Sequence, residues 1–80
     1  MDNQAIVISE ILSILNKVKD DKISDLDANL FGKKYDFTAG EMLDVCMELR
    51  RKYGINLNLF YRNISEFTVN NIAEALQKVC

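Results

Sequence analysis

Apolar side chains recur at helical spacing in three segments of this chain, and that spacing constrains the fold more than any other feature. Within each segment they stand mostly three or four residues apart, so each set lies along one face of an α-helix. The three sets are Ile8, Ile11, Leu12, Leu15 and Val18; Met42, Val45, Cys46, Leu49 and Tyr53; and Val69, Ile72, Ala73, Leu76 and Val79. With no proline and three glycines, nothing in the chain favours a sheet. We therefore expect an all-α protein.

Local signals predict where these helices begin and end. Thr38 and Glu41 have the spacing of a capping box, which predicts that the second helix begins at Thr38. Gly54 can adopt the left-handed conformation that ends a helix. Asp2 and Thr68 are side chains of the kind that cap helix N-termini, so we expect them to cap the first and last helices.

A long connection, residues 19–37, separates the first two helices. It carries four apolar side chains, which predict that it crosses the core rather than extending into water: Ile23, Leu26, Leu30 and Phe31. A short third helix is expected near residues 58–64. The 80 residues suit one domain, 1–80. The expected architecture is three main helices, a short third helix and a long first loop.

Charge and residue types exclude several classes of function. The net charge is −2, whereas nucleic-acid-binding proteins carry a basic surplus. The chain has no histidine, which removes the commonest general base and the commonest metal ligand. The sequence also shows no nucleophile–base pair, metal-ligand spacing or glycine-rich loop. We predict no enzymatic activity, no bound metal and no nucleic-acid partner.

The cysteines and the N-terminus bear on location. Cys46 and Cys80 are the only cysteines, and two cysteines without a secretion signal are typical of reduced thiols in a cytoplasmic protein. The opening stretch MDNQAIVISEI lacks the basic start of a signal peptide. No apolar run approaches the ~18 residues of a membrane span. We expect a cytoplasmic monomer without membrane association, in which Cys46 is a buried structural thiol.

Three segments in order resemble the acyl and peptidyl carrier protein family. They are ISDLDANLF in the first loop, EMLDVCMELRRKYGINL in and after the second helix, and FTVNNIAEAL at the last helix. The resemblance covers nearly the whole chain. It implies the four-helix bundle of that family, which agrees with the helices expected from apolar spacing.

The family resemblance also draws attention to the start of the second helix. Carrier proteins have an Asp-Ser-Leu signature there, and the serine holds a 4′-phosphopantetheine arm. Counting without gaps places this signature on Thr38, Ala39 and Gly40. Thr38 can still cap the helix, but Ala39 has no hydroxyl to form the phosphodiester, so we predict no bound cofactor. A shift of one residue would place Thr38 on the serine, and the capping-box spacing argues against that shift.

In the carrier family the second helix is an acidic docking surface for basic enzymes. Here three carboxylates follow helical spacing, but Arg50 and Arg51 stand where many carriers have further acids, which implies a different partner. Tyr61 and Arg62 are candidates to line a partner groove. The residues predicted to contact the partner are Glu41, Asp44, Glu48, Arg51, Tyr61 and Arg62.

The first hypothesis for function is a non-enzymatic adaptor that docks on biosynthetic enzymes in trans. Such a protein resembles the acyl-carrier-related proteins of bacterial peptide-maturation gene clusters. The second hypothesis is a true acyl or aminoacyl carrier loaded at Thr38 or at a thiol. The third is a helical protein-interaction domain unrelated to carriers.

Overall fold

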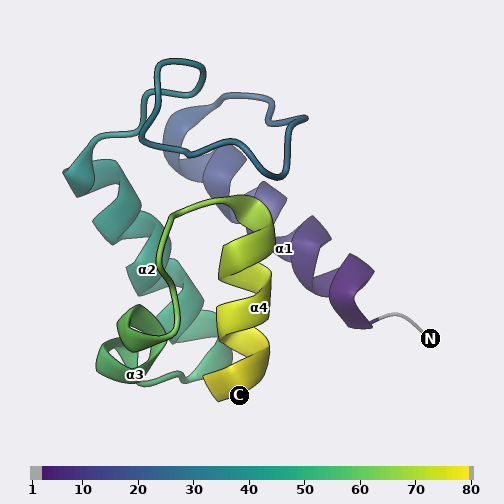
Figure 1. Cartoon of the computed structure of the whole chain (residues 1–80), viewed down its shortest axis with the longest axis vertical. Helices are drawn as coiled ribbons and strands as arrows, with labels where there is room; N and C mark the ends of the chain where they lie inside the picture. Colours follow the sequence, from purple (N-terminus) through teal and green to yellow (C-terminus); the bar gives the residue numbers. More distant parts are fainter. Residues whose placement is uncertain (1–2, 80) are drawn as a thin grey trace.

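Four helices make up the regular structure of the protein, which we describe from a computed structural model over residues 3–79 (Figure 1). They are α1 (Asn3–Lys19), α2 (Ala39–Tyr53), α3 (Leu57–Arg62) and α4 (Val69–Val79). No strand occurs within the described residues. The all-α prediction is confirmed, whereas the predicted cap at Asp2 and the role of Cys80 lie outside the described residues.

The capping signals of α2 act as predicted. Thr38 has extended backbone angles, and its hydroxyl accepts a hydrogen bond from the Glu41 amide at 3.1 Å. The Glu41 carboxylate accepts in return from the Thr38 amide at 2.9 Å, which completes the capping box. At the other end Gly54 has a φ of 66°, and its amide donates to the Arg50 carbonyl at 2.7 Å.

The boundaries predicted for the short third helix were wrong by one or two residues. Asn56 caps α3 by accepting from the Leu59 amide at 3.2 Å, so the helix begins at Leu57. Asn63 donates its side-chain amide to the Leu59 carbonyl at 2.9 Å, which ends the helix at Arg62. The prediction for α4 holds, since the Thr68 hydroxyl accepts from the amide of Asn71 at 3.0 Å.

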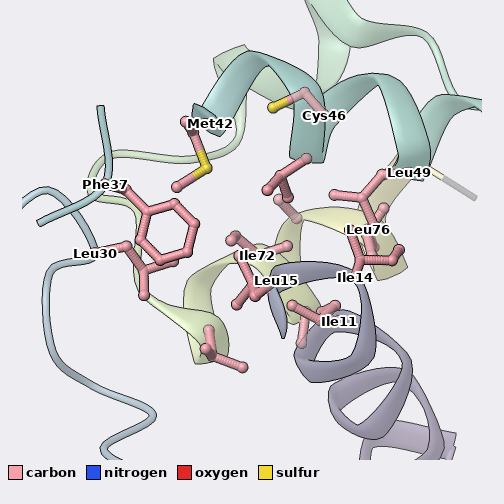
Figure 2. Close-up of a cluster of buried hydrophobic side chains, with 14 of the residues drawn as sticks. Ile11, Ile14, Leu15, Leu30, Phe37, Met42, Cys46, Leu49, Ile72 and Leu76 are labelled. Carbon is pink, nitrogen blue, oxygen red and sulfur yellow. The ribbon is translucent and has the colours of Figure 1, made fainter. Parts of the chain in front are cut away.

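The core lies between α1, α2 and α4 and is closed at one end by the first loop. α1 packs against both α2 and α4, and α3 packs against α4. Figure 2 shows Leu30 and Phe37 of the loop beside Met42 of α2, with side chains of α1 and α4 completing the cluster. The predicted faces of α2 and α4 are buried at all but their last positions, Tyr53 and Val79, which are half-buried.

The long loop is held in place by backbone hydrogen bonds to the segment that leads into α4. The Leu30 amide donates to the Phe67 carbonyl at 2.8 Å, and the Asn70 amide donates to the Leu26 carbonyl at 3.1 Å. Within the loop, the buried Tyr35 hydroxyl accepts from the amides of Ser24 and Asp25, each at 3.0 Å. These amide donors lower the pKa of Tyr35, Asp25 having the largest effect.

The prediction that four apolar loop side chains enter the core was right for three and wrong for the fourth. Leu30 and Ile23 are buried and Leu26 is half-buried against the core. Phe31 is 41% exposed, because its ring lies on the surface in a T-shaped contact with the Phe67 ring, 5.6 Å between centroids. In the described part of the chain, no helix is both long enough and apolar enough to cross a membrane.

Candidate functional site

Ala39, the position that the resemblance to carrier proteins aligns with their serine, lies at the first turn of α2. Because Thr38 is the cap, Ala39 is the first helical residue, and its side chain is exposed. Gly40 follows in ordinary helical conformation. A side chain added at Gly40 would meet only the Thr38 hydroxyl, at 3.9 Å. Packing therefore does not require a small residue at Gly40.

An open apolar groove adjoins Ala39. Its volume is about 330 Å³, and its walls come from the first loop, α2, α3 and the segment before α4. The lining residues are Phe31, Ala39, Met42, Leu43, Cys46, Tyr61 and Phe67. Leu43 is 54% exposed and Tyr61 40%. Large apolar side chains exposed around one groove are typical of a surface that binds another molecule.

The two titratable groups in the groove are both held neutral. Cys46 is 2% exposed, as predicted for a structural thiol. Burial raises the pKa of the Cys46 thiol, and the neighbouring Tyr61 hydroxyl lowers it by less. Burial also raises the pKa of Tyr61, and the Cys46 thiol adds to that rise. At neutral pH the groove therefore presents no thiolate nucleophile.

The acidic stripe predicted on α2 is divided by ion pairs. Glu41 lies 3.3 Å from the Lys19 ammonium of α1. Glu48 lies 3.5 Å from Lys17 and 3.1 Å from Arg51. Glu41 and Glu48 thus face α1, and their charge is already balanced within the chain.

Lys19 joins three elements beside this first turn. Besides its pair with Glu41, its ammonium donates to the Asp36 carbonyl at 2.7 Å and lies 5.4 Å from the centre of the Phe37 ring. The Thr38 amide, followed by Lys19, lowers the pKa of Glu41. The end of α1, the end of the loop and the start of α2 are therefore held together by one cation.

The remaining predicted contact residues lie on the outward and groove sides of α2 and on α3. Asp44 is exposed and forms no ion pair among the described residues. Tyr61 lines the groove, and Arg62 follows it, also exposed. The structure thus brings Tyr61 to the groove and turns Glu41 and Glu48 towards the opposite side of α2.

Sequence reasoning missed most of the groove. Leu43 and Met47 stand beside the core face of α2 at helical spacing, so their exposure was a detectable signal. The pairing of Phe31 with Phe67 left no such signal, because the two rings come from distant parts of the chain. No protein-family model, curated protein or solved structure matches the chain. The resemblance to carrier proteins therefore rests on the motifs of this sequence.

Proposed function

We propose that this protein is a non-enzymatic, acyl-carrier-like adaptor that docks on enzymes of a biosynthetic system, of the peptide-maturation kind, without carrying 4′-phosphopantetheine. The observation that carries the proposal is that Thr38 is the N-cap of α2. Since Thr38 caps α2, the first helical position belongs to Ala39. In carrier proteins that position holds the serine to which the arm is attached. A methyl group offers no oxygen, so Ala39 does not fit the arm.

Neither Thr38 nor Cys46 is a good substitute for the missing serine. The Thr38 hydroxyl already accepts the Glu41 amide, and esterifying it would weaken the acceptor that begins α2. Its β-methyl also crowds the attacking oxygen. Cys46 is buried and protonated, so it is a poor nucleophile.

The groove beside Ala39 supports docking. An adaptor without an arm must act through its surface, and this groove combines exposed Phe31, Leu43 and Tyr61 with a neutral apolar floor. Aromatic and aliphatic side chains of this kind are enriched where proteins bind one another. The groove also touches Ala39, so a partner seated there would cover the position that carrier proteins use for loading.

The decisive experiment is an intact-mass measurement after incubation with a phosphopantetheinyl transferase and coenzyme A. We expect no mass gain, while a conventional carrier protein in the same reaction gains one arm. A gain of one arm by the native chain would refute the adaptor and support a carrier loaded at a non-standard residue. Peptide mapping would then locate the modified side chain.

A further inference from the structure

We infer that the partner seated in this groove is an acidic amphipathic helix of another protein. Its apolar side chains would fill the groove, and its carboxylates would meet Arg50 and Arg62. The inference rests on the proposed docking function and names the chemistry of the partner.

The apolar part of the surface has the length of a short helix. Ala39 and Leu43 line the groove, and Met47, which is also exposed, continues the same side of α2. From Ala39 to Arg50, α2 extends about 16 Å, which is about three helical turns. A partner helix of that length presents apolar side chains at i, i+3, i+4 and i+7, the arrangement that fits a groove between packed elements.

The charged part of the surface comes from the last turns of α2 and α3, which lie at the same end of the molecule (Figure 1). Arg50 stands one turn beyond Cys46, and Arg62 directly follows Tyr61. Both arginines are exposed, and neither forms an ion pair within the described residues. Two unpaired guanidinium groups beside an apolar groove complement carboxylates, with which arginine forms paired hydrogen bonds.

The acids near the groove do not cancel this positive charge. Glu41 and Glu48 are already paired with lysines of α1. Glu66 precedes Phe67 and accepts a hydrogen bond from Asn29 at 3.2 Å, which leaves its charge in place. The segment that carries it runs from α3 to the start of α4 at the other end of the molecule, away from the arginines (Figure 1). Asp44 is the acid of α2 that forms no ion pair among residues 3–79. Its single negative charge is smaller than the combined positive charge of Arg50 and Arg62. The end of the groove nearest the two arginines therefore favours an acidic partner, although the chain carries a net charge of −2.

The test uses two synthetic amphipathic peptides with identical leucines and either glutamates or lysines at the flanking positions. We expect the glutamate peptide to shift the backbone amide NMR signals of Leu43, Met47 and Tyr61. It should bind about fivefold more tightly than the lysine peptide, as two exposed ion pairs predict. Raising the salt concentration should reduce this preference.

A charge-reversed pair of variants gives the matched control. The double variant Arg50→Glu/Arg62→Glu should prefer the lysine peptide. Lys33→Glu/Lys78→Glu makes the same change in net charge at exposed positions outside the groove and should keep the preference for glutamate.

Four outcomes would overturn the inference: tighter binding of the lysine peptide by the native chain, equal affinity for both, no shift at millimolar peptide, or shifts confined to the side of α2 that faces α1. Self-association that buries Leu43 in sedimentation and NMR experiments would also overturn it, by making a second copy the occupant. Each of these results would overturn the acidic partner without any gain in mass. The adaptor proposal fails only if the native chain gains an arm in the intact-mass test, so the two failures are distinguishable.

Discussion

The two sides of α2 differ in whether their side chains are paired within the chain or exposed without an ion-pair partner. On the side that faces α1, charges are paired within the chain: Glu41 with Lys19, Glu48 with Lys17, and Lys52 with Glu10 at 3.8 Å. On the groove side, Leu43 and Tyr61 are exposed and Arg50 has no ion-pair partner in the described structure.

This difference shows that a count of charges along a helix does not tell which of those charges are already paired within the chain. Three carboxylates on α2 suggest an acidic face, but lysines of α1 lie beside two of them and offset their charge. The groove side has fewer acids, but it has more exposed apolar surface and an arginine without an ion pair among the described residues. The following predictions test whether the two sides are as separate as the structure indicates.

The largest expected effect concerns the first turn of the groove side. Ala39→Ser alone should load poorly, because Gly40 lacks the leucine side chain that follows the serine in carriers. Ala39→Ser/Gly40→Leu should gain one phosphopantetheine arm, since the space around Gly40 is open. Intact mass after reaction with the transferase and coenzyme A measures both. Efficient modification of the single variant would show that Gly40 does not limit loading.

A second comparison is between a buried leucine of the core and an exposed leucine of the groove. Leu30 is fully buried in the first loop, so Leu30→Ala should lower the free energy of unfolding by about 3 kcal/mol. Leu43→Ala removes an exposed side chain of the same size and should change stability by less than about 0.5 kcal/mol. Urea denaturation measures both. Leu43→Ala should still weaken binding of the acidic peptide, and unchanged affinity would remove Leu43 from the docking surface.

The glycines at the two ends of α2 should respond in opposite directions. Gly54 has a φ of 66°, where an added Cβ is strained, so Gly54→Ala should destabilise the fold by about 1 kcal/mol. Gly40 lies in the helix with open space around it, so Gly40→Ala should stabilise the fold by about 0.5–1 kcal/mol. Thermal unfolding of both variants is the measurement. A destabilised Gly40→Ala would reveal a constraint at the first turn that its open surroundings do not explain.

The smallest expected effect is a pH dependence on the paired side. The pKa of Glu41 is lowered in the folded protein, first by the Thr38 amide and then by Lys19. Its contribution is therefore present above the ordinary glutamate pKa and lost as the pH falls through the lowered value. Glu41→Gln should be less stable than the native chain near neutral pH, and the difference should shrink in acid.

Asp44→Asn is the matched control for this measurement. Asp44 lies on the outward side of α2 without an ion pair among residues 3–79. The substitution should leave the unfolding free energy nearly unchanged near neutral pH. A loss as large as that of Glu41→Gln would mean that the two sides of α2 are not electrostatically distinct.

Features that depend on neighbouring residues were predictable from the sequence. The helices, the capping box at Thr38 and the left-handed end at Gly54 involve residues within one turn of each other, so their spacing carries the information. The bounds of α3 were less predictable, because Asn56 and Asn63 decide them through side-chain hydrogen bonds that compete with the helix.

In the candidate site, too, the features that depend on neighbouring residues were predictable and those that depend on distant residues were not. Ala39 at the first helical position follows from the cap, and so does the absence of a hydroxyl there. The wall formed by Phe31 and Phe67 could not be predicted, because the two rings meet only when the first loop hydrogen bonds to the segment before α4. Helical spacing placed Met42 and Cys46 on the apolar face of α2 and Leu43 beside it, and Tyr61 was predicted to line a partner groove.

By itself, the amino-acid sequence determined four helices, the ends of α2 and the absence of a hydroxyl at Ala39, since each depends on local spacing or on the side chain present. Only the tertiary structure decided that Glu41 and Glu48 are neutralised by α1, and that Leu43 and Tyr61 border an open groove. The physical reason is that ion pairs and grooves require groups distant in sequence to meet, and the packing of whole elements controls which groups do.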